Sequence, residues 1–177
     1  MSLYDVSKIE DGLFLSSETP ALLQSVNGDK VQFNVILSIC YIVPVEERNK
    51  NVIYHGWEIE DDEKFQINQY FGEMISYIRK YQRQNKRILV HCHMGISRSA
   101  TVVIAFLMKK YHWSFLNSFW HVKSQRGFID PNQGFIEQLQ TYGKSIALNH
   151  HRDVLFRIFK HYNSKIVYLT LQFFIID

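Results

Sequence analysis

The fold of this 177-residue chain is decided by the stretch RILVHCHMGISRSATVVIAFLM, residues 87–108. It opens with a short apolar run, Ile88–Val90, that has no polar alternation and therefore predicts a strand buried on both faces. After Arg98, the residues from Ala100 to Met108 are apolar all round apart from Thr101, which predicts a helix inside the core. The stretch therefore predicts a buried strand, a short loop and a buried helix.

Short apolar or β-branched runs elsewhere in the chain predict further strands. They are Leu13–Leu15, Val35–Ile39 and Val52–Tyr54, and they alternate with segments of helical character. Strands that alternate with helices build a sheet with helices packed on its faces. The predicted fold class is α/β, with a central mixed sheet of about five strands flanked by helices.

Apolar residues that recur every three or four positions predict an amphipathic helix over 65–84. Two later helices are expected to follow Ser114 and Asn132, because both residue types are preferred N-caps. An earlier helix is expected to be capped by Thr19 and to end before Gly28. These helices would supply the layers that cover the sheet.

The composition of the chain limits its function. Hydrophobic residues make up 46% of the sequence, which is enough for one globular domain with a core. The net charge is only +3 and no block of Lys and Arg occurs, so we expect no nucleic-acid partner. The two cysteines, Cys40 and Cys92, make no disulfide framework, and residues 1–12 lack a secretory signal. We therefore expect a cytoplasmic protein, with the nucleus as a further location.

The loop between the buried strand and the buried helix is suited to holding an anion. It lies at the carboxyl end of a strand, where open α/β sheets bind ligands, and its N–H groups converge near the positive end of a helix. Gly95 permits the tight turn, and Arg98 offers a planar fork that matches two oxygens of a phosphate. The same field stabilises the thiolate of Cys92. Together these residues predict a nucleophile for phosphate transfer.

The loop sequence resembles the Cys-x5-Arg-Ser/Thr loop of the cysteine-dependent protein tyrosine phosphatases. It consists of Cys92, five intervening residues, Arg98 and Ser99. The longer string HCHMGISRSAT at 91–101 is similar to the dual-specificity branch, as are DGLFL at 11–15 and PNQGF at 131–135. The resemblance implies a protein tyrosine phosphatase-like fold and a small, stand-alone (atypical) member. It implies a catalytic domain over 1–148 and a C-terminal extension of unknown role over 149–177.

The resemblance also implies an activity, the hydrolysis of phosphotyrosine and of phosphoserine or phosphothreonine in proteins through a phosphocysteine intermediate. Cys92 would be the nucleophile, Arg98 would hold the phosphoryl oxygens, and Ser99 would donate a hydrogen bond to the thiolate. The expected partner is a phosphorylated protein, and the chemistry needs no metal or other cofactor. The loop residues expected to bind substrate are His93, Met94, Gly95, Ile96, Ser97 and Arg98.

A general acid on a separate loop must protonate the leaving oxygen, and two neighbouring residues compete for that role. In the family, the acid follows an apolar–acidic pair and precedes an apolar residue six positions later. The segment Ile59–Asp61, with Ile67 after it, fits this frame, so Asp61 is the predicted acid. Asp62 remains the alternative, because the spacing alone does not exclude it.

Three more residues are expected to support the loop. His91 is predicted to fix it by a hydrogen bond. Asn132 is predicted either to cap a helix alone or, as the resemblance to the family implies, to brace the loop as well. By resemblance to the inositol-lipid branch, Cys40 is predicted either to pack as a small hydrophobe or to pair with Cys92 under oxidation. The triplet His91–His93 is not expected to bind metal, because adjacent side chains diverge from a strand end.

Two other functions remain open. One is a phosphatase of the same loop chemistry that acts on an inositol lipid or an RNA 5′ end, and the other is a phosphoprotein-binding pseudophosphatase. Residues 93–97 carry no lysine for extra phosphates, which argues against the lipid. Cys92, Arg98 and Asp61 are all present, which argues against loss of catalysis.

The extension after residue 148 interleaves apolar and basic residues. This pattern favours either an extra helix packed on the domain or a poorly ordered extension. The alternative is a basic amphipathic segment that rests on a membrane surface or on a partner. Its longest apolar run, IVYLTLQFFII at 166–176, is too short to span a bilayer as a helix. The oligomeric state stays open.

Overall fold

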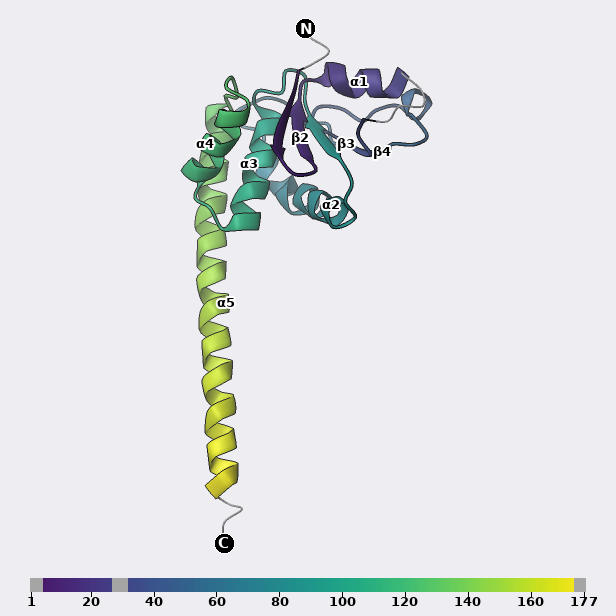
Figure 1. The fold of residues 1–177 in the computed structure, drawn as a ribbon. Coiled ribbons are helices and arrows are strands. Elements are labelled where there is room, and N and C mark those ends of the chain that lie inside the picture. Colours follow the sequence, from purple (N-terminus) through teal and green to yellow (C-terminus); the bar gives the residue numbers. More distant parts are fainter. Residues whose placement is uncertain (1–4, 27–31, 174–177) are drawn as a thin grey trace. The chain divides into compact units, whose positions relative to one another are not determined.

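The computed structural model describes residues 5–26 and 32–173. Over these residues the chain forms a five-stranded sheet in the order β1-β2-β5-β3-β4, shown in Figure 1. Only the β1–β2 pair is antiparallel, so the sheet is mixed, and the predicted α/β class is confirmed. The strands are β1 (Val6–Glu10), β2 (Leu13–Ser16), β3 (Val35–Ser38), β4 (Ile53–Gly56) and β5 (Ile88–His91).

Helices cover both faces of the sheet (Figure 1). The helices of the chain are α1 (Glu18–Val26), α2 (Phe71–Arg83), α3 (Arg98–Tyr111), α4 (Phe115–Gln125) and α5 (Gln133–Phe173), with the 3-10 turns η1 (Val45–Glu47) and η2 (Ile67–Tyr70). On one face Ala21 of α1 joins Ile36 of β3 and Leu89 of β5 in a buried cluster. On the other face α2 and α3 contact β5.

The strand–loop–helix stretch forms the centre of the core, as predicted. All four residues of β5 are buried, and so is every residue of α3 from Arg98 to Met108. Burying one Val, Leu or Ile side chain contributes roughly 1.5–3 kcal/mol. The loop between β5 and α3 is therefore held at both ends by well-packed elements.

The register of the three central strands places their carboxyl ends at one edge of the sheet. His91, the last residue of β5, lies opposite Ser16 of β2 on one side and Ser38 of β3 on the other. All three strands run parallel, so the segments that follow them emerge together. The functional side chains are found at this edge.

One strand was not predicted, and one predicted helix cap was wrong. β1 was missed, because Ile9 is its only fully buried residue and so its sequence lacks the clear apolar alternation of a strand. Helix α1 begins at Glu18, so Thr19 lies inside the helix and is not its cap. Glu18 N–H donates to the backbone oxygen of His93 at 3.3 Å, a tertiary contact that local sequence does not reveal. Gly28 lies outside the described residues.

The two later N-caps are confirmed. The Ser114 hydroxyl accepts a hydrogen bond from Asn117 N–H at 3.2 Å, and the Asn132 side-chain oxygen accepts one from Phe135 N–H at 2.9 Å. The helix predicted over 65–84 is shorter, with η2 as its first turn and α2 as the remainder.

The chain divides into two compact units, residues 1–143 and residues 144–177, and α5 runs through the boundary. The boundary expected from the sequence at 148/149 stays a prediction. Within the described residues, no helix is both long enough and apolar enough to cross a membrane.

Candidate active site

Cys92 lies at the base of the loop that joins β5 to α3, and only 1% of its surface is exposed. Its Sγ accepts hydrogen bonds from Gly95 N–H at 3.3 Å and from the Ser99 hydroxyl at 3.1 Å. Donors aimed at sulfur stabilise a thiolate, which is the nucleophilic form of cysteine. The Ser99 hydroxyl thus makes the hydrogen bond to the Cys92 sulfur that was expected from the sequence.

Arg98 is the first residue of α3, and its buried side chain reaches across to the loop that carries Asp61. One terminal nitrogen, Nη1, donates to the backbone oxygen of Ile59 at 3.0 Å. The Nε lies 3.4 Å from a carboxylate oxygen of Asp61, an ion pair that does not meet the geometry of a hydrogen bond. These contacts hold the guanidinium in one orientation beside the loop between β5 and α3.

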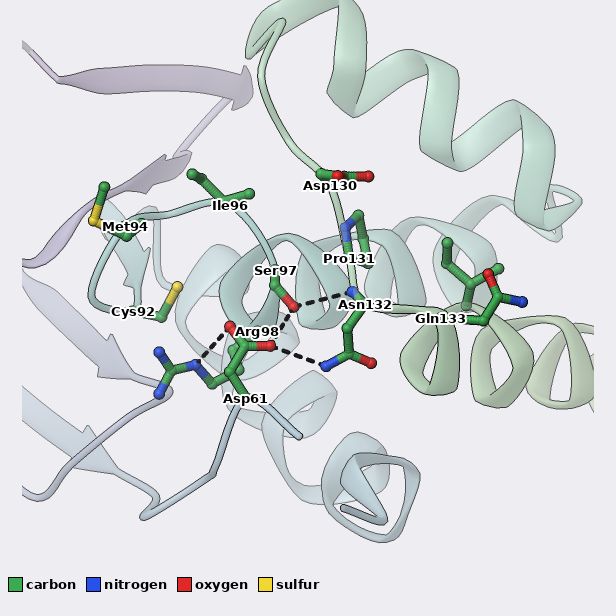
Figure 2. A pocket seen from close by; sticks show the side chains of 11 residues that line it. Asp61, Cys92, Met94, Ile96, Ser97, Arg98, Asp130, Pro131, Asn132 and Gln133 are labelled. Carbon is green, nitrogen blue, oxygen red and sulfur yellow. Dashed lines mark hydrogen bonds and ion pairs between the residues drawn. The ribbon is translucent and has the colours of Figure 1, made fainter. Parts of the chain in front are cut away.

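Asp61 is tied to the loop on one side and to the segment before α5 on the other, as Figure 2 shows. Its Oδ1 accepts a hydrogen bond from the Ser97 hydroxyl at 2.6 Å and another from the Asn132 side-chain amide at 2.9 Å. Asn132 also donates its backbone N–H to the Ser97 hydroxyl at 3.2 Å. Asn132 therefore braces the site as well as capping α5.

The neighbouring acid has a different environment. Both acids are exposed, but the Asp62 Oδ1 accepts a hydrogen bond from Lys64 N–H at 2.7 Å, which stabilises a local turn. Of the two candidate acids, only Asp61 is among the residues that line the cavity above Cys92. The tertiary structure thus separates two residues that the spacing could not.

A cavity of about 530 Å³ opens over the Cys92 sulfur. Four of its lining residues were not predicted from the sequence. Three of these, Asp130, Pro131 and Gln133, lie close to Asn132 in the chain, which was predicted. Asp130 and Pro131 precede α5, whereas Gln133 and Ile136 lie in its first turn, and the PNQGF string at 131–135 marks this stretch in the sequence. The described lining is Asp61, Cys92, Met94, Ile96, Ser97, Arg98, Asp130, Pro131, Asn132, Gln133 and Ile136.

Arg126, which no motif had singled out, holds the outer side of the loop. It is 2% exposed and donates to the backbone oxygens of Gly95 at 2.8 Å and Met94 at 3.2 Å. An ion pair of 2.8 Å with Asp5 fixes the guanidinium. Gly95 has φ of +66°, and a Cβ there would collide with the Ser16 backbone and the Arg126 side chain. Only glycine fits this position.

A family model described as the dual specificity phosphatase catalytic domain matches residues 13–145. The chain belongs to the dual specificity phosphatase family. Dual specificity protein phosphatase 1B of Arabidopsis thaliana is 36% identical over 149 residues, which are 82% of this chain and 86% of that protein. Protein phosphatase Slingshot of Drosophila melanogaster is 36% identical over 141 residues, 77% of this chain. Those residues are 13% of Slingshot, so the match covers a small part of that protein.

Solved structures agree with this family. The crystal structure of human DUSP28 superimposes with a TM-score of 0.70 and 25% sequence identity, covering 81% of this chain and 95% of that one. The resemblance found in the sequence is therefore confirmed for both the family and the fold.

The two histidines beside Cys92 have different environments. Burial lowers the pKa of His91 to about 4, so its ring is neutral at physiological pH. Although the Cys92 backbone partly offsets this effect, neither ring nitrogen makes a well-formed hydrogen bond within the described structure. The loop-fixing hydrogen bond of His91 stays a prediction. The ring packs edge-on against Tyr41, with centroids 6.0 Å apart.

His93 turns towards the segment after β2. Its Nδ1 lies 2.8 Å from a carboxylate oxygen of Glu18, and its ring stacks on Tyr41 at 6.2 Å. It is not among the described residues that line the cavity, so only its backbone remains a candidate for phosphate binding.

Cys40 follows β3 as Cys92 follows β5, and these two strands are parallel neighbours. Burial raises the pKa of the Cys40 thiol to about 11, and the nearby charge of Cys92 adds to the increase. Its Sγ also lies 3.7 Å from the Ser38 hydroxyl, within hydrogen-bonding reach. Cys40 is thus a protonated thiol at neutral pH. It lies close enough to Cys92 for a negative charge on that sulfur to raise the Cys40 pKa. Its pairing with Cys92 under oxidation stays a prediction.

Proposed function

We propose that this protein dephosphorylates phosphotyrosine and phosphoserine or phosphothreonine in other proteins through a phosphocysteine intermediate. The observation that carries the proposal is the convergence of Cys92, Arg98 and Asp61 on one cavity. They come from a strand end, a helix start and a separate loop, and each bears the side chain that one step of the reaction needs.

In the first step, the Cys92 thiolate attacks phosphorus and the bond from phosphorus to the leaving oxygen breaks. Asp61 gives its proton to that oxygen, so that tyrosine, serine or threonine departs as a neutral hydroxyl. Arg98 and the loop N–H groups stabilise the charge on the remaining phosphoryl oxygens. The product is a thiophosphate ester of Cys92.

In the second step, water attacks the same phosphorus and transfers a proton to the Asp61 carboxylate. The sulfur–phosphorus bond breaks, and inorganic phosphate leaves carrying the oxygen of the attacking water. The returning thiolate is stabilised by the Ser99 hydroxyl and by Gly95 N–H, which already point at the sulfur. Asp61 therefore acts first as acid and then as base, from one position fixed by Ser97 and Asn132.

The character of the cavity favours a phosphorylated protein as substrate. Met94 and Ile96 line it with apolar groups, and Arg98 is the only cation among its described lining residues. An inositol lipid with several phosphates would need more positive charge than this.

We propose a cytoplasmic location, extending to the nucleus, because both Cys40 and Cys92 are free thiols that suit a reducing compartment.

The decisive experiment compares turnover on matched phosphotyrosine and phosphothreonine peptides, an inositol phospholipid and a triphosphorylated RNA. Both peptides should be hydrolysed, the lipid and RNA much more slowly, and Cys92→Ser should be inactive on all of them. Faster turnover of the lipid or RNA would replace the protein substrate. A folded wild type that binds phosphopeptides without turning over any substrate would indicate a pseudophosphatase.

A further inference from the structure

Three side chains of metal-binding type lie together beside the phosphate-binding loop. They are Glu18, Cys40 and His93, and one ligand atom from each lies within 4.8 Å of the other two. None of the three is among the described residues that line the catalytic cavity. The reaction proposed above uses none of these side chains.

The sheet register brings the three residues together. Ser16, His91 and Ser38 lie opposite one another on the adjacent parallel strands β2, β5 and β3. Glu18, His93 and Cys40 each lie two residues beyond one of these aligned positions. The cluster is thus built by three neighbouring strand ends that the core holds in place, and not by a mobile loop.

The donor set matches zinc more closely than it matches magnesium or calcium. A thiolate, an imidazole and a carboxylate are the ligands that Zn²⁺ takes in proteins, whereas the harder cations prefer oxygen alone. Three protein ligands leave the fourth tetrahedral position for water. The side chains of His93 and Glu18 are 52% and 34% exposed, so an ion can reach the cluster from solvent.

We propose that Glu18, Cys40 and His93 form a zinc-binding site at the rim of the active site. On binding, the Cys40 thiol loses its proton to solvent and the sulfur becomes a ligand, with no change in oxidation state. The metal would tie His93, which directly follows the nucleophile, to the ends of β2 and β3. It would also occupy Cys40 and so keep that thiol from reacting with Cys92.

Cobalt provides the test, because Co²⁺ replaces zinc and shows a charge-transfer absorption when it binds a thiolate. The chain has two cysteines, so full-length Cys92→Ser retains Cys40 as its only thiol. This variant should bind one Co²⁺ and show the thiolate band, and added Zn²⁺ should abolish that band. Cys40→Ser, which retains only Cys92, should lack it. A band in Cys40→Ser together with none in Cys92→Ser would place the metal on the nucleophile and overturn the proposal.

The carboxylate ligand is tested by affinity. Replacing even an outer-shell partner of a metal site costs about 10- to 100-fold in affinity, so Glu18→Gln in the Cys92→Ser background should bind Co²⁺ at least roughly tenfold more weakly. Glu46→Gln, at an exposed glutamate of η1, is the matched control and should bind as the parent does. Equal affinity in the two variants, both with parental far-UV circular dichroism, would exclude Glu18 from the site. These measurements do not depend on phosphatase activity.

Discussion

Arg126 and Met94 are joined by a hydrogen bond of 3.2 Å, from the guanidinium Nη2 to the backbone oxygen. The peptide unit that carries this oxygen also carries the Gly95 N–H, which donates to the Cys92 sulfur at 3.3 Å. One end of the peptide is therefore held by a buried arginine while the other end points at the nucleophile. Arg126 is a positioning residue, since it acts on the reaction only through the loop.

The first prediction concerns this positioning. Arg126→Met should lower kcat/KM by about 10², because misplacing the loop N–H groups by about 1 Å costs that much. The measurement is kcat/KM on an aryl phosphate well below the melting temperature of the variant, together with its affinity for inorganic phosphate. Arg83→Met, at an exposed arginine of α2, is the control and should behave as wild type. Unchanged kcat/KM and phosphate affinity in folded Arg126→Met would contradict the positioning role.

The second prediction separates the two neighbouring acids. Asp61→Asn should lower turnover by about 10² to 10⁴ on phosphopeptides, whose leaving groups need a proton, and much less on activated aryl phosphates. Asp62→Asn should stay close to wild type on both, because Asp62 stabilises an exposed turn. Rates on the two substrate classes would be compared side by side. The reverse pattern would make Asp62 the general acid.

The third prediction concerns stability against pH. His91 is neutral in the folded state, where burial lowers its pKa from 6.5 to about 4. Its contribution to the free energy of unfolding is therefore fully present above pH 6.5 and is lost as the pH falls towards 4. The loss should be on the order of 3 kcal/mol.

Urea unfolding at several pH values between 7 and 4 would measure this loss. His91→Asn removes the titrating group, so its stability should depend less steeply on pH over that range, even if it is lower at pH 7. His151→Asn, at an exposed histidine, should keep the wild-type slope. If His91→Asn shows the full wild-type slope, acid destabilisation has another origin.

The fourth prediction uses the two thiols at neighbouring strand ends. Under mild peroxide, and with metal removed by a chelator, the wild type should lose activity and recover it with dithiothreitol, because a disulfide between Cys40 and Cys92 protects the nucleophile from further oxidation. Cys40→Ser should instead become irreversibly oxidised at Cys92. Mass spectrometry would identify the disulfide in one protein and the sulfinic or sulfonic acid in the other. Equal recovery of the two would leave Cys40 as a packing residue.

The sequence by itself determined the strand, loop and helix around Cys92. Its signals are local, since an apolar run, a glycine, an arginine and a second apolar run follow one another within residues 87–108. The helix caps at Ser114 and Asn132 were predictable for the same reason, because a cap bonds to an N–H three residues along the chain. The family resemblance rests on these same local strings.

Only the tertiary structure decided which distant side chains meet. Asp61 and Asp62 are adjacent in the sequence. What distinguishes them as candidate acids is the contacts that Asp61 makes with Ser97 and Asn132. The hold of Arg126 on the loop and the cluster of Glu18, Cys40 and His93 likewise join segments far apart in the chain. The register of β2, β5 and β3 brings the members of that cluster together, and it arises from long-range strand pairing and core packing, which no local pattern encodes.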